Sequence, residues 1–88
     1  MHRKEVYKII DQEREYQSLK WNERTADSNG FHSITEFLVF IRDYTEEALH
    51  AESRMDEKSA DEFATHTVRK IAALAVACME QNGALKRS

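Results

Sequence analysis

The stretch "SITEFLVFIRDYTEEALH", Ser33 to His50, carries the clearest signal for the fold. Its apolar residues recur every three or four positions, which is the spacing of one face of an α-helix. Ser33 and Glu36 precede this run in the Ser-x-x-Glu order of a capping box, a common start of a helix. We therefore expect a helix over residues 33–53. Its core face consists of Ile34, Phe37, Leu38, Ile41, Tyr44, Ala48 and Leu49.

A second stripe of the same helix is acidic and includes an aromatic residue. Glu36, Asp43 and Glu47 lie within about 40° of one another around the helix axis, and Phe40 lies among them. Carboxylates gathered in this way suit Mg²⁺, which prefers oxygen ligands. Asp43, Glu46 and Glu47 are thus candidate metal ligands, and Glu36 is a candidate catalytic residue. The alternatives are a solvated charged face and, for Glu36, the capping role alone.

A first helix is expected over residues 3–20, where apolar residues again recur at helical spacing. Glu13 projects into the middle of this apolar face, where a carboxylate is costly to bury unless it is paired or bound to a metal. Because we expect this face to meet the second helix, Glu13 is a candidate to join the acidic stripe as a catalytic residue or further metal ligand. Lys20, which borders the face, and Trp21, which ends the helix, are candidate ligand-binding residues.

A third helix is expected over residues 59–81, with Ser59 as its N-cap and Gly83 as its terminator. From Ile71 to Met79 it is apolar nearly all round, which is typical of a helix covered on most sides. Three helices of an 88-residue chain cannot cover it completely, so we expect self-association into a homodimer or homotetramer.

Arg69 and Lys70 lie on the polar side of the third helix together with His66. Cationic groups gathered in this way could bind phosphate oxygens, and arginine suits bidentate contacts. Ion pairs with the acidic stripe of the second helix are the alternative. The chain has no proline and only two glycines, both outside the expected helices, so the sequence predicts one all-α domain over residues 1–88. In that domain three main helices form an antiparallel bundle that oligomerisation completes.

The composition excludes several classes of function. A net charge of −3 and a pI near 5.8 argue against binding to DNA or RNA, where a basic surface is expected. The single cysteine, Cys78, permits no internal disulfide and lies in an apolar run, as a buried thiol of a reducing compartment does. No apolar run reaches the length of a membrane span or has the form of a signal peptide. We expect a cytoplasmic protein that has no membrane partner, in the host cytoplasm if a phage encodes it.

Three segments together resemble a known group of proteins. They are "EREYQSLKW" (residues 13–21), "HSITEFLVFIRDYTEEA" (residues 32–48) and "RKIAALAVACMEQNGA" (residues 69–84). They resemble small phage and prophage proteins called MazG-like, after the all-α nucleotide pyrophosphohydrolases. The resemblance covers most of the chain, whereas the similarity to catalytic MazG proteins rests on helix order and partial motifs.

The resemblance implies an oligomer in which a Glu-x-x-Glu on one helix and a Glu-x-x-Asp on the next hold Mg²⁺. The metal and its water would then cleave a nucleoside triphosphate to the monophosphate and pyrophosphate. Asp43 and Glu46 match the first pair, with aspartate in place of glutamate. The second pair should fall where this chain reads "TVRK", residues 67–70, and neither carboxylate is present there. Glu13 and Glu36 would have to complete an altered site.

Two functions of different kinds, and one purely structural interpretation, are compatible with these residues. The first is a Mg²⁺-dependent nucleoside triphosphate pyrophosphohydrolase, in which Arg69 and Lys70 hold the phosphates and the metal activates the attacking water. The second is a helical oligomer without catalysis, an accessory module that binds a nucleotide-like small molecule or a host protein. In the structural interpretation, every charged residue belongs to the surface or to a salt bridge.

Overall fold

The computed structural model describes residues 1–24 and 31–88, and for residues 21–24 it describes the backbone alone. The described chain forms three α-helices, α1 (Arg3–Arg24), α2 (Ile34–Ala51) and α3 (Glu57–Asn82), and contains no strand. The predicted all-α fold of three packed helices is confirmed, although α1 continues past Lys20 to Arg24. Within these ranges no helix combines the length and the apolar character that a membrane span requires.

The capping box at the start of α2 is present as predicted. The Ser33 hydroxyl accepts a hydrogen bond from the Glu36 amide at 3.1 Å, and the Glu36 carboxylate accepts one from the Ser33 amide at 3.0 Å. Two amides at the helix start that lack intrahelical partners are satisfied in this way.

The start of α3 differs from the prediction. Asp56, not Ser59, is the N-cap, and its carboxylate accepts a hydrogen bond from the Ser59 amide at 3.2 Å. An aspartate at this position both caps the helix and places a negative charge at the positive end of the helix dipole, so α3 starts two residues earlier than expected. Gly83 ends α3, as predicted, with a φ of +90° that an L side chain rarely adopts.

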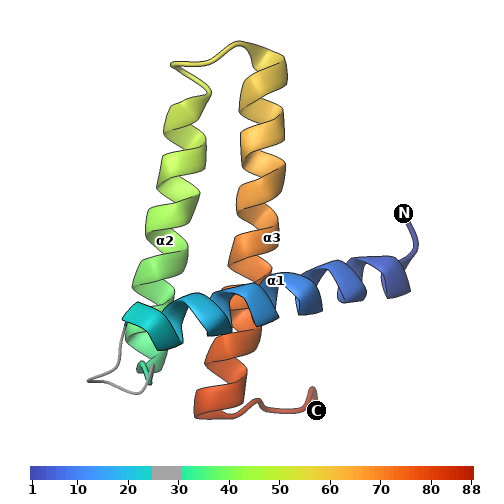
Figure 1. The fold of residues 1–88 in the computed structure, drawn as a ribbon, viewed down its shortest axis with the longest axis vertical. Coiled ribbons are helices and arrows are strands. Elements are labelled where there is room, and N and C mark those ends of the chain that lie inside the picture. The colour runs from blue at the N-terminus through green and yellow to red at the C-terminus, as the bar shows by residue number, and fades with distance from the viewer. Residues whose placement is uncertain (25–30) are drawn as a thin grey trace.

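Figure 1 shows α2 and α3 side by side in opposite directions, as a hairpin that α1 crosses near its lower end. α3 packs against both other helices, whereas α1 and α2 do not approach closely in the described part of the chain. The expectation that the face of Glu13 meets the second helix is therefore wrong, because that face meets α3.

The core is small and lies between α2 and α3. Phe37, Leu74 and Ala77 are its buried members, and Phe40 and Tyr44 are among the half-buried residues that pack against it. Phe40 lies at the border between this core and the surface. This position explains why an aromatic residue occurs within the acidic stripe of α2. Of the described large hydrophobic residues, many stay exposed, which is expected for so short a chain.

Candidate functional site

A cleft of about 720 Å³ lies where α1 crosses the hairpin. All three helices contribute to its walls, together with the residue that precedes Ser33 at the start of α2. Four of the site residues predicted from the sequence line it, namely Glu13, Lys20, Arg69 and Lys70. The other lining residues are Tyr16, Gln17, His32, Phe40, Tyr44 and Leu74. The arrangement combines cationic groups with aromatic rings.

The two lysines of the cleft lie over aromatic rings. The Nζ atom of Lys20 lies 5.1 Å from the centre of the Tyr16 ring, and that of Lys70 lies 6.0 Å from the centre of the Tyr44 ring. Neither lysine forms an ion pair with a carboxylate among the residues that the structure describes. A cation–π contact is weaker than a charge-assisted hydrogen bond to an anion. Both ammonium groups are consequently available to an incoming anion.

Arg69, the third cationic residue of the cleft, is paired within the chain. Its Nε donates to the buried carboxylate of Glu13 at 2.5 Å, and its Nη1 lies 2.7 Å from Nδ1 of His66. The second contact is a hydrogen bond when that imidazole nitrogen is unprotonated. The predicted alternative of an ion pair for Arg69 is thus correct in kind, but its partner is on α1 and not on the acidic stripe. Glu13 is satisfied without a metal.

Gln17 is buried at the junction of α1 and α3. Its Nε2 donates to the backbone oxygen of Lys70 at 3.1 Å and so connects the two helices. Its Oε1 is buried and has no hydrogen-bond partner among the described residues. Buried acceptors in native proteins are nearly always satisfied by protein, water or ligand, so this atom marks a polar position within the cleft wall.

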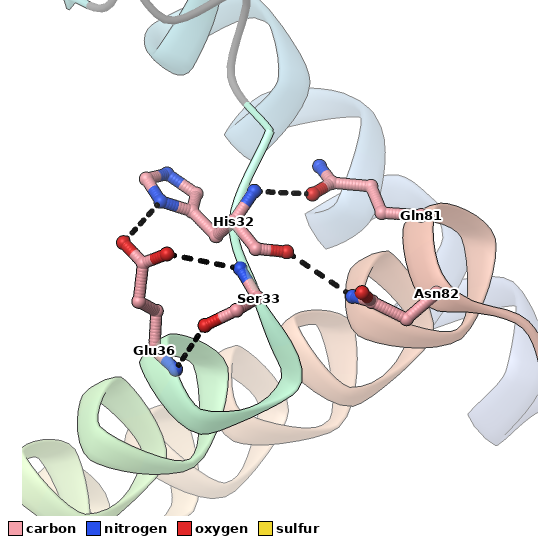
Figure 2. A network of polar contacts seen from close by, with 5 residues as sticks. All are labelled: His32, Ser33, Glu36, Gln81 and Asn82. Atoms are coloured by element: carbon pink, nitrogen blue, oxygen red, sulfur yellow. Dashed lines mark hydrogen bonds and ion pairs between the residues drawn. The ribbon is translucent and has the colours of Figure 1, made fainter.

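His32 and Phe40 form an aromatic wall. The His32 ring lies edge-to-face with the Phe40 ring at 5.1 Å and with the Phe37 ring at 5.7 Å. The backbone of His32 is held at both ends by α3: its amide donates to Gln81 at 2.8 Å, and its carbonyl accepts from Asn82 at 3.1 Å (Figure 2). The start of α2 is thereby attached to the end of α3, which fixes the position of the imidazole.

Glu36 belongs to this network and not to the cleft lining. One carboxylate oxygen accepts from the Ser33 amide, and the other lies 3.3 Å from Nδ1 of His32 (Figure 2). The hydrogen bond from the Ser33 amide, followed by the contact with His32, lowers the pKa of the exposed Glu36 carboxyl below its usual value. The structure therefore places Glu36 in the capping role, away from the cleft, and gives no support to its predicted catalytic role.

The acidic stripe of α2 does not converge on the cleft. Asp43, Glu46 and Glu47 are exposed, and none of them lines the cleft. Asp43 lies 3.8 Å from its exposed neighbour Arg42. Among the side chains that the structure describes, in residues 1–20 and 31–88, no three His, Cys, Asp or Glu residues gather as a metal site would require. The described carboxylates thus do not fit Mg²⁺ by themselves, and the predicted metal site would need further ligands.

The sequence interpretation missed the aromatic part of the site. Tyr44 was assigned to the core face of the second helix, Phe40 was placed among the residues of the acidic stripe, and His32 was not among the predicted site residues. Phe40 and Tyr44 are four residues apart, so they occupy one face of α2. That signal indicated an aromatic face, but not that α1 would leave it uncovered. The side chain of Trp21 lies outside the described part of the chain.

Comparisons of the chain with protein-family models, with curated proteins and with solved structures gave no match.

Proposed function

We propose that the cleft binds a nucleoside triphosphate or a related phosphorylated nucleotide. The observation that carries this proposal is the presence, in one cleft, of two lysines without carboxylate partners in the described chain and four aromatic rings. The rings are those of Tyr16, His32, Phe40 and Tyr44. The volume of about 720 Å³ is in the range typical of small-molecule sites.

Lys20 and Lys70 are the groups that would bind the phosphates. They come from different helices and have long, flexible side chains, so both can approach one phosphate chain. Each would exchange a cation–π contact for a charge-assisted hydrogen bond, which is the stronger interaction. Arg69 adds positive potential beside them, although Glu13 offsets its charge.

The aromatic rings are the groups that would receive the base. A nucleobase stacks on an aromatic side chain with about 1–3 kcal/mol per base, largely irrespective of its sequence identity. Tyr16 on α1 and Phe40 on α2 both line the cleft, so a base bound there would have aromatic rings from two helices available to it.

Binding without hydrolysis is favoured over hydrolysis by a single chain. Of the described residues that line the cleft, Glu13 alone carries a carboxylate, and Arg69 is already paired with it. Hydrolysis of the MazG type stays a prediction that rests on the resemblance of the three segments. It would require further acidic residues in the cleft, which a second protomer could supply.

We also propose that the chain forms a homodimer through apolar side chains outside the cleft. On α2, Ile34, Leu38 and Leu49 lie along one stripe and are exposed. On α3, Val68 and Met79 share a stripe and are exposed as well. Covering these residues with a second copy would remove apolar surface from water at about 25 cal/mol per Å². Size-exclusion chromatography with light scattering tests this, and a monomer at high protein concentration would contradict it.

Isothermal titration with ATP, GTP, CTP, UTP and tripolyphosphate tests the nucleotide proposal. At least one nucleotide should bind, and the double variant Lys20→Ala/Lys70→Ala should lower its affinity by about tenfold or more for two lost charged contacts. Lys58→Ala, an exposed change on α3 outside the cleft, is the matched control. Equal affinities of the double variant and the control would refute the assignment.

The same samples separate binding from turnover. Pyrophosphate release is measured with and without Mg²⁺ on the nucleotide that binds most tightly. Binding without release supports the module without catalysis. Mg²⁺-dependent release that Asp43→Asn or Glu46→Gln abolishes would instead support hydrolysis through the acidic stripe.

A further inference from the structure

Gln17 lines the cleft, and only one of its two side-chain polar atoms has a hydrogen-bond partner among the described residues. Its side chain is only 9% exposed, its Nε2 donates to the Lys70 carbonyl, and its Oε1 has no partner among the described residues. The carbonyl of Lys70 can only accept, so the Gln17 amide cannot be turned round without the loss of this bond. The bond to Lys70 therefore fixes Oε1 as the atom of this side chain that still lacks a partner among the described residues.

We propose that Gln17 determines which ligands the cleft accepts, by receiving a hydrogen bond from an N–H group of the bound nucleobase through its Oε1. The inference rests on the proposed nucleotide binding and adds the chemistry of the base. A base that carries an amino or ring N–H group would complete the bonding of Gln17. A base without any N–H group would leave the buried acceptor without a partner.

The neighbours of Gln17 support a base and not a phosphate at this position. Tyr16 precedes it on α1 and lines the same cleft, while Lys20 lies one turn further along the helix. A phosphate oxygen carries no N–H group and would face an acceptor, which repels it. The aromatic residues of the cleft suit the base, and its two lysines suit the phosphates.

Contact with Oε1 requires some movement, because this atom is covered by its neighbours. Lys20 and Lys70 are suited to move, since each is held by an aromatic ring and by no carboxylate in the described ranges. The approach of phosphate would draw both ammonium groups away from the rings.

Purine riboside triphosphate provides the test, because its base has the shape of adenine and carries no N–H group. Isothermal titration compares it with the four natural nucleotides on the wild-type protein and on Gln17→Met, a variant of similar volume without an acceptor. Tripolyphosphate serves as the ligand without a base. The wild type should bind at least one natural nucleotide about tenfold or more tightly than purine riboside triphosphate, since a buried acceptor without a partner costs that much or more.

In Gln17→Met this difference should fall to about threefold or less, with tripolyphosphate affinity unchanged, because the buried acceptor is gone. Equal binding of purine riboside triphosphate and the natural nucleotides to the wild type would overturn the inference and leave nucleotide binding intact. That comparison needs no variant, so it decides the matter even if Gln17→Met does not fold. A preference that Gln17→Met retains would likewise overturn it. If no nucleotide binds the wild type, both proposals fail.

Discussion

Replacement of Arg69 by methionine should destabilise the protein more than replacement of its partner Glu13 by glutamine. The two side chains form an ion pair at 2.5 Å, but they are buried unequally, with the glutamate 8% exposed and the arginine 31% exposed. Arg69→Met leaves a carboxylate buried without its cation. Glu13→Gln leaves a guanidinium that water reaches and that still contacts His66.

The expected losses in the free energy of unfolding follow from this difference in burial. Removal of one partner of a fully buried pair costs roughly 3–5 kcal/mol, because the other charge stays buried and uncompensated. Partial access of water at Arg69 lowers the expected cost of Arg69→Met to just below this range, at about 2–3 kcal/mol. Glu13→Gln should cost about 1 kcal/mol, the typical contribution of a hydrogen bond. The double variant should be more stable than Arg69→Met alone, by about 1 kcal/mol or more, since it buries no unpaired charge.

Urea unfolding followed by the helical circular dichroism signal measures these free energies of unfolding. Arg42→Met, at an arginine whose side chain is 64% exposed, is the control and should change stability by about 0.5 kcal/mol or less. A cost for Arg69→Met no greater than that of Glu13→Gln would refute the reasoning. A double variant that loses the sum of both single costs would show that the two groups act independently.

Three further predictions concern the helices that form the site. Phe37→Ala removes a side chain that is 0% exposed and should cost about 3–5 kcal/mol in urea unfolding, whereas Leu38→Ala, 58% exposed, should have a small effect on a monomer. Asp56→Ala should cost about 1 kcal/mol as the loss of an N-cap, and an equal cost for Ser59→Ala would contradict the assignment of the cap. The folded-state pKa of Glu36 is lowered, so its charge stabilises the fold above the ordinary pKa and that contribution is lost as the pH falls below about 4.5. Glu36→Gln should therefore lower the melting temperature at neutral pH, and the difference should disappear in acid.

The sequence predicted the helices better than their arrangement. Helical spacing of apolar residues and the capping box located the start of α2 at Ser33, because both signals are local, whereas the helix ends two residues before the predicted end. The start of α3 was placed too late, since Asp56 and Ser59 are both acceptable caps and only the tertiary context selects one. The crossing of α1 depends on which faces of the other two helices are filled, and no local pattern contains that information.

The candidate site was predicted in part for the same reason. Glu13 was identified as a candidate catalytic residue, and Lys20, Arg69 and Lys70 as candidate ligand-binding residues, and all four line the cleft. The acidic stripe was also identified, but its residues stay in solvent, because a helix presents a charged stripe equally well to water or to a partner. Spacing along one helix cannot decide between these environments.

The cleft itself follows from the polar residues in the middle of α1. Glu13 and Gln17 occupy the centre of the face that α1 turns to the protein, and both find their partners on α3, with Arg69 and the Lys70 carbonyl. Polar groups that must keep these partners hold α1 on α3 and prevent it from packing an apolar face along α2. Phe40 and Tyr44 of α2 are left without a covering helix and become cleft walls. The residues that make α1 a poor bundle helix are thus the ones that create space for a ligand.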